Sequence, residues 1–120
     1  MKRVLIVDDE VALTTLLKAN LESTGRFEAQ TENRGAAAVR AAQRFKPDIV
    51  LLDIMMPDME GTEVLNRMRQ TASLREVPVI FLTATLMEGE SGAGGENYTF
   101  LPKPIEADAL IAAIDDLIGQ

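Results

Sequence analysis

Two kinds of hydrophobic pattern alternate along this chain. Residues 4–7, 49–52 and 79–82 are runs of four consecutive apolar side chains, rich in branched residues. Such runs are typical of strands that are buried on both faces. The stretches between them carry apolar residues three and four positions apart, which is typical of helices with one buried face. The pattern therefore predicts strands that alternate with helices.

The positions of the helices follow from this spacing and from the residues that end them. Helices are expected after residue 10 as far as Gly25, at 35–44, at 62–70 and from about residue 106 onward. The first of these would bury its four leucines, Leu13, Leu16, Leu17 and Leu21. Two shorter strands are expected, one at 27–31 and one through Phe100 and Leu101.

Alternating strands and helices with uniformly apolar strands indicate an α/β fold. The expected architecture is a doubly wound parallel sheet with helices on both faces, joined by right-handed crossovers. Neither a repeat nor a linker interrupts the 120 residues, so residues 1–120 are expected to form one domain. Pro102 lies in the last strand and favours an edge position, because an edge strand can spare a hydrogen-bond donor.

The segment between Thr83 and Phe100 departs from the alternation because it is rich in glycine. Its four glycines lie within 89–95. Each glycine inside a helix costs roughly 1 kcal/mol relative to alanine, so a helix through all four would lose about 4 kcal/mol. We therefore expect a fourth helix that is short, displaced or absent, and a mobile stretch from Gly89 to Gly95. The alternative is an ordered loop pinned by Tyr98.

Composition excludes several classes of function. A net charge of -7 argues against direct binding of nucleic acid, which needs a basic surface. The absence of cysteine and histidine removes thiolate catalysis, cysteine zinc sites and the usual general base. Neither a secretory signal nor a membrane-spanning run is visible, so a cytoplasmic protein without a membrane partner is expected. Any chemistry must use carboxylates, hydroxyls, lysine or a hard metal ion.

Polar residues follow four of the expected strands. Asp8 and Asp9 follow the first strand, Asp53 the third, Thr83 the fourth and Lys103 the fifth. The carboxyl ends of parallel strands share one edge of a sheet, where α/β proteins bind ligands. Each residue alone has an ordinary structural explanation, as a helix cap, a turn residue or a solvated side chain. Their convergence on one edge favours a functional site.

The residue types at this edge suggest phosphoryl transfer. Three neighbouring carboxylates repel one another unless a cation lies between them, and oxygen ligands without histidine or cysteine favour Mg²⁺. Asp53, as an ionised carboxylate, can attack phosphorus and form an aspartyl phosphate without a general base. Lys103 and the Thr83 hydroxyl can then stabilise the phosphoryl oxygens.

Four motifs, in this order and spacing, resemble those of the response regulator receiver domain of two-component phosphorelay signalling. The resemblance covers essentially the whole chain. The motifs are Val7-Asp8-Asp9-Glu10, Leu52-Asp53-Ile54-Met55-Met56-Pro57 through Gly61, Leu82-Thr83-Ala84 and Lys103-Pro104.

The resemblance implies a flavodoxin-like five-stranded sheet in the order 2-1-3-4-5. It implies that Asp53 accepts a phosphoryl group from a sensor histidine kinase or a phosphotransfer protein. Asp9, Asp53 and the backbone carbonyl of Met55 would ligate Mg²⁺, and Asp8 would bind it largely through water. A cis peptide bond is expected before Pro104.

The resemblance also implies a switch rather than an enzyme with an external substrate. Only phosphotransfer to Asp53 and its autodephosphorylation are expected. Thr83 and Phe100 would be the switch residues, and Phe100 lacks the hydroxyl of the tyrosine that is commoner there. Phosphorylation would change the surface of the fourth helix, fifth strand and fifth helix for a partner or output domain. The sequence ends at Gln120 and leaves open whether the receiver acts alone or within a longer chain.

Three other functions fit the architecture less well. Phosphatases that resemble the haloacid dehalogenases carry an Asp-x-Asp motif after the first strand, whereas this chain has adjacent Asp8 and Asp9. A flavin-binding module would need a hydroxyl- or glycine-rich phosphate loop there, and Glu10 adds a third carboxylate that repels phosphate. A degenerate receiver that binds partners without phosphorylation would not need the complete set of site residues found here.

Overall fold

The computed structural model describes residues 1–84 and 97–119. The strands in these ranges are β1 (Lys2–Val7), β2 (Phe27–Glu32), β3 (Ile49–Asp53), β4 (Val79–Thr83) and β5 (Tyr98–Pro102). The helices are α1 (Val11–Glu22), α2 (Ala38–Phe45), α3 (Gly61–Arg69) and α4 (Ala107–Ile118), with 3₁₀ turns at Gly35–Ala37 and Ala72–Leu74.

The label α4 denotes the last helix of the chain, which the sequence pattern counts as the fifth. Residues 85–96, in which the irregular fourth helix and the stretch Gly89 to Gly95 were predicted, lie outside the described residues. No helix in the described ranges is long and apolar enough to cross a membrane.

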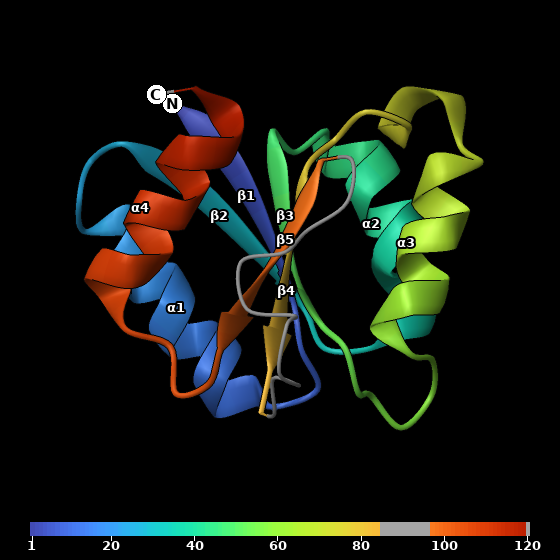
Figure 1. The fold of residues 1–120 in the computed structure, drawn as a ribbon, viewed down its shortest axis with the longest axis horizontal. Coiled ribbons are helices and arrows are strands. Elements are labelled where there is room, and N and C mark those ends of the chain that lie inside the picture. The colour runs from blue at the N-terminus through green and yellow to red at the C-terminus, as the bar shows by residue number, and fades with distance from the viewer. Residues whose placement is uncertain (85–96, 120) are drawn as a thin grey trace.

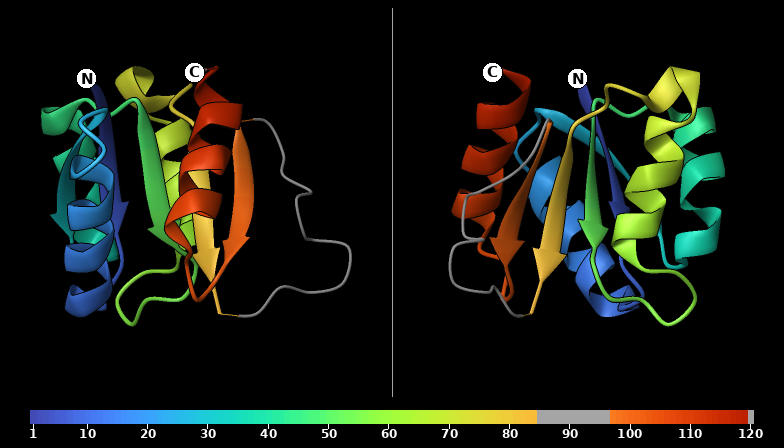
Figure 2. Two further views of the ribbon diagram at one scale, coloured as in Figure 1. Left: turned by 90° about the vertical axis from the view of Figure 1, so that its left-hand side faces the viewer. Right: turned by 45° about the vertical axis from the view of Figure 1, so that its right-hand side comes forward.

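All five strands run parallel in the order β2-β1-β3-β4-β5, which confirms the predicted sheet. Figure 1 shows α1 and α4 on one face of the sheet and α2 and α3 on the other. The two further views in Figure 2 show the arrowheads of the strands meeting at one edge. Strand β5 lies at the end of the sheet, as Pro102 predicted, and Pro102 is the last residue of its register with β4.

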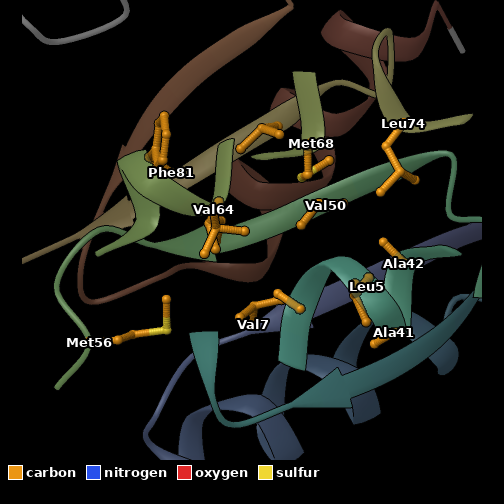
Figure 3. Close-up of a cluster of buried hydrophobic side chains, with 13 residues drawn as sticks. Leu5, Val7, Ala41, Ala42, Val50, Met56, Val64, Met68, Leu74 and Phe81 are labelled. Atoms are coloured by element: carbon orange, nitrogen blue, oxygen red, sulfur yellow. The ribbon is translucent and has the colours of Figure 1, made fainter. Parts of the chain in front are cut away.

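The sheet separates two hydrophobic layers. Successive strand residues point to opposite faces, so Val50 and Leu51 belong to different layers although both are buried. One layer, shown in Figure 3, packs strand residues such as Val50 and Phe81 against α2 and α3. The other packs Leu51 and its neighbours against α1 and α4. Burial on both faces explains why these strands are continuous apolar runs.

Two details of the helices differ from the sequence pattern. Leu16 was expected to face inward but is 55% exposed. The buried stripe of α1 centres on Leu17 and Leu21. Leu16 is one residue before Leu17 and is therefore rotated by about 100° around the helix axis, away from this stripe. The helix predicted from residue 35 begins as the 3₁₀ turn Gly35–Ala37 and becomes α-helical only at Ala38.

Candidate functional site

The polar residues predicted to converge do so at the carboxyl edge of the sheet. Asp8 directly follows β1, Asp53 ends β3, Thr83 ends β4 and Lys103 directly follows β5. Asp8, Asp53 and Thr83 are buried, whereas Asp9 is exposed. One carboxylate oxygen from each of Asp8, Asp9 and Asp53 lies within 4.8 Å of the others. Residues far apart in the sequence thus form one acidic cluster.

The backbone after Asp53 folds back on itself and leaves no room for a side chain at Gly61. The Gly61 N–H donates a 2.7 Å hydrogen bond to the carbonyl oxygen of Ile54. A Cβ atom at position 61 would collide with the carbonyl oxygen of Asp53. The Met55 N–H donates to Asp53 Oδ1 at 3.3 Å. This hydrogen bond holds the carboxylate against the start of the loop. The short loop therefore places the Met55 peptide beside the Asp53 side chain.

Lys103 lies among three carboxylates. Its Nζ atom is 3.0 Å from Asp8 Oδ2, 3.2 Å from Glu10 Oε1 and 3.6 Å from Asp53 Oδ1. The Lys103 N–H donates to the carbonyl oxygen of Thr83 at 2.7 Å, so the backbone that carries the ammonium is tied to β4. The peptide bond between Lys103 and Pro104 is cis, as predicted.

The environment of Asp53 disfavours its charge. Burial and the neighbouring Asp8 carboxylate raise the pKa of Asp53 to about 6, and a hydrogen bond with Asp9 acts in the same direction. The Lys103 ammonium and the Met55 N–H oppose this rise in pKa. Burial acts to lower the pKa of Lys103, but its contacts with Asp8, Glu10 and Asp53 outweigh burial, and the pKa is raised. Among the residues that the structure describes, the carboxylates of the site thus carry more negative charge than the Lys103 ammonium balances.

A hollow of about 240 Å³ opens beside Asp53. Its lining consists of Asp9, Glu10, Asp53, Met55, Thr83, Ala84 and Lys103. Asp8 Oδ2 is buried, and its polar contact among the described residues is the Lys103 ammonium at 3.0 Å. Carboxylates that converge within 4.8 Å and share one ammonium retain uncompensated negative charge, which fits a hard divalent cation such as Mg²⁺. The donor set at this edge is thus suited to the predicted metal.

Phe100, the predicted switch aromatic, lies in a group of three rings. It stacks on Phe81 with centroids 5.5 Å apart and meets Tyr98 edge to face at 5.9 Å. Phe81 and Tyr98 also meet edge to face, at 5.7 Å. Phe81 precedes Thr83 by two residues on β4, so the ring group connects the edge strand to the strand that ends in the candidate site.

Three residues near the site have contacts that the sequence pattern did not indicate. Glu10 pairs with Lys103, Asn33 donates to the carbonyl oxygen of Asp8, and Asp58 accepts two backbone hydrogen bonds from the start of the turn before α2. Glu10 and Asp58 belong to the sequence motifs around Asp8 and Asp53. Their positions in these motifs were a signal that they could contribute to the site. Asn33 carries no such signal.

Two curated proteins are similar in sequence to this chain. It is 35% identical over 98% of its length to the transcriptional regulatory protein TrcR of Mycobacterium tuberculosis. It is 36% identical over 94% of its length to the alkaline phosphatase synthesis transcriptional regulatory protein PhoP of Bacillus subtilis. It covers 46% and 48% of these two relatives, so it spans about half the length of the curated proteins it matches.

Solved structures show the same fold over nearly the whole chain. The chemotaxis protein CheY4 of Vibrio cholerae has a TM-score of 0.86 and 26% identity, with 98% of both chains covered. The receiver domain of a sensor histidine kinase from Pseudomonas aeruginosa PAO1 has a TM-score of 0.85 and 30% identity, with 99% of this chain and 98% of that one covered. That structure holds a magnesium ion in its active-site cleft. A family model matches residues 4–115, and the chain therefore belongs to the response regulator receiver domain family.

Proposed function

We propose that this receiver domain is a phosphorylation-dependent signalling switch whose phosphoacceptor is Asp53. The observation that carries the proposal is the placement of the Asp53 carboxylate, which borders the hollow at the carboxyl edge of the sheet together with Lys103 and two further carboxylates. The donor would be a sensor histidine kinase or a phosphotransfer protein. Asp53, Thr83 and Lys103 would act directly on the phosphoryl group.

Asp8, Asp9, Asp53 and the Met55 carbonyl oxygen would hold Mg²⁺. The ion supplies positive charge that offsets the repulsion between the carboxylates and the incoming phosphoryl group. The proposal is supported by the convergence of three carboxylate oxygens within 4.8 Å and by the excess of carboxylates over the Lys103 ammonium that they share. The exposed Asp9 carboxylate would ligate the ion directly, whereas Asp8 is already paired with Lys103.

The proposed reaction is a single displacement at phosphorus. An oxygen of the ionised Asp53 carboxylate forms a bond to phosphorus, and the bond between phosphorus and the donor's imidazole nitrogen breaks. The electron pair of that bond stays on the donor nitrogen, which leaves as neutral imidazole once protonated by solvent. No general base is required, because the carboxylate is the nucleophile in its ionised form. Hydrolysis of the same acyl phosphate by water returns Asp53 to its starting state.

Lys103 and Thr83 would link phosphorylation to a change of shape. Lys103 Nζ lies 3.6 Å from Asp53 Oδ1, so it can pair with a phosphoryl oxygen once Asp53 carries one. Thr83 is at the end of β4 and lines the same hollow. Rearrangement of these groups would repack Phe100 and change the surface of β5 and α4, which a partner or an output domain would read.

Acetyl phosphate with and without Mg²⁺, followed by intact mass measurement, tests the proposal. A small phosphodonor removes the need for the unidentified kinase. We expect a single phosphate adduct that forms only with Mg²⁺. Absence of any adduct with Mg²⁺ present would refute the proposed function. Continuous turnover of a phosphomonoester would instead indicate a hydrolase of the aspartyl-phosphate type.

A further inference from the structure

We infer that residues 32–36, which comprise the last residue of β2 and the start of the turn toward α2, position both loops that carry the proposed metal ligands. We call these residues the clamp segment. The inference rests on the proposed function, because it concerns the geometry of the Mg²⁺ site. No side chain of the clamp segment lines the hollow beside Asp53. Its part is to hold two other loops at a fixed separation.

The first of these loops is the acidic turn after β1. The Asp8 N–H donates to the carbonyl oxygen of Glu32 at 3.1 Å. Asn33 Nδ2 donates back to the carbonyl oxygen of Asp8 at 2.7 Å and also to Thr14 Oγ1 at 3.0 Å. Both backbone polar groups of Asp8 are therefore bound to the clamp segment. Thr14 is buried on α1, so Asn33 fixes the turn against the helix that follows it.

The second loop connects β3 to α3. The Asp58 carboxylate accepts hydrogen bonds from the Gly35 N–H at 3.1 Å and the Ala36 N–H at 2.9 Å. The hydrogen bond from the Ala36 N–H is the main cause of a lowered pKa of Asp58, and the bond from Gly35 acts in the same direction. The carboxylate therefore stays ionised. Packing adds to the hydrogen bonds, because a Cβ atom at Gly35 would lie 2.9 Å from the carbonyl oxygen of Met59. The loop tip is thus seated closely on the clamp segment.

The two attachments have a joint effect on the metal site. One loop presents Asp8 and Asp9, and the other presents Asp53 and Met55. Ionised carboxylates from the two loops repel one another and would drive the loops apart. A common anchor opposes this repulsion and holds the ligands near the geometry that the ion needs. Groups that orient metal ligands through hydrogen bonds affect metal affinity although they do not contact the ion. Asn33 and Asp58 are therefore positioning residues.

Titration calorimetry of the whole chain with Mg²⁺ tests this role. We expect Asp58→Ala and Asn33→Ala each to raise the Kd for Mg²⁺ by about tenfold, the low end of the loss seen when groups that orient metal ligands are removed. Since either change breaks the same connection, the double variant should bind only slightly more weakly than each single variant, so the two effects are not additive. Asp58→Asn retains an acceptor oxygen and should recover part of the affinity.

Asp48→Ala is the matched control. Asp48 Oδ2 accepts the Arg3 N–H at 2.8 Å at the opposite edge of the sheet, so this variant likewise loses one charge, together with one hydrogen bond that a backbone N–H donates to the carboxylate, against two in Asp58→Ala. Its Kd for Mg²⁺ should equal that of the wild type. The rate of phosphorylation by acetyl phosphate should reach the wild-type value in Asp58→Ala when Mg²⁺ is saturating, because the variant then holds the ion.

The outcomes that overturn the inference differ from those that overturn the proposed function. A wild-type chain that binds no Mg²⁺ would refute the proposed metal site and the inference with it. A wild-type chain that binds Mg²⁺ only as tightly as Asp58→Ala and Asp58→Asn would refute the inference alone. Equal weakening in Asp58→Ala and Asp48→Ala would also refute it, because the effect would then come from net charge or stability.

Discussion

Lys103 Nζ lies 3.0 Å from Asp8 Oδ2, although the two residues follow strands that are separated in the sheet by β3 and β4. The contact spans the width of the candidate site. It places one ammonium where it shares its charge with the Asp8 and Asp53 carboxylates. A phosphoryl group on Asp53 would add negative charge within reach of the same ammonium, so phosphorylation must redistribute these contacts.

Replacement of the phosphoacceptor is the most direct prediction. Asp53→Asn should abolish the phosphate adduct that acetyl phosphate and Mg²⁺ produce, because an amide is a poor nucleophile and carries no charge for the metal. Intact mass measurement over time provides the readout. Asp116→Asn, on the exposed side of α4, is the control and should be phosphorylated normally. An adduct that forms on Asp53→Asn at the wild-type rate would show that another residue accepts the phosphate.

The raised pKa of Asp53 predicts how stability depends on pH without Mg²⁺. The pKa rises from 3.8 to about 6 in the folded chain. In this range the folded chain keeps a proton that the unfolded chain has released, so the free energy of unfolding falls as the pH rises and levels off above about 6. At neutral pH, Asp53→Asn should therefore be more stable than the wild type by roughly 1–2 kcal/mol, less than the full shift because of screening.

Urea denaturation at about pH 5 and about pH 7 in a metal chelator measures this contribution. Asp58, with its lowered pKa, affects stability only near and below its ordinary pKa of 3.8, outside this range, and every other titratable group is common to the wild type and Asp53→Asn. The informative quantity is therefore the difference between the wild type and Asp53→Asn. That difference should grow from the lower to the higher pH. A constant difference would mean that Asp53 titrates normally.

The two residues of the acidic turn should contribute unequally to metal binding. Asp9→Asn should weaken Mg²⁺ binding more than Asp8→Asn, because Asp9 is exposed at the hollow while Asp8 accepts the Glu10 N–H and pairs with Lys103. Titration calorimetry on both variants gives the comparison. An equal or larger loss in Asp8→Asn would assign direct ligation to Asp8.

Removal of Lys103 should separate metal binding from switching. Lys103→Ala deletes the positive charge among the carboxylates, so Mg²⁺ should bind at least as tightly as in the wild type. The phosphorylated variant should lack the change at β5 and α4, because no ammonium pairs with the new phosphoryl group. Amide hydrogen exchange before and after phosphorylation measures this change. A wild-type response in Lys103→Ala would exclude the proposed coupling role, and Lys2→Ala at the opposite edge is the control.

Much of the fold and the set of candidate site residues followed from the sequence, for physical reasons. Strands such as β3 and β4 are buried on both faces and therefore appear as unbroken apolar runs. Parallel strands end at one edge, so Asp53, Thr83 and Lys103 could be placed together before their distances were known. The exposure of Leu16 was not predictable from spacing alone, because a leucine beside a buried stripe can face either solvent or a neighbouring element.

The contacts of Asn33 and Asp58 could not be read from the sequence. They join loops separated by 25 and 23 residues, and hydrogen bonds between loops follow no period. Glu10 was part of a motif, yet its pairing with Lys103 depends on the relative position of two strand ends. Such contacts depend on tertiary structure, whereas hydrophobic periodicity reports only local structure and burial.

The division of the core into two layers has a consequence for engineering and divergence. Val50 and Leu51 are adjacent in β3, yet they pack in different layers. Side chains without shared packing partners change stability independently, so a redesign beneath α2 and α3 leaves the packing beneath α1 and α4 intact. Substitutions on one side of the sheet therefore have little effect on the packing of the other side. One face of this receiver can acquire a new partner surface while the other keeps its original packing.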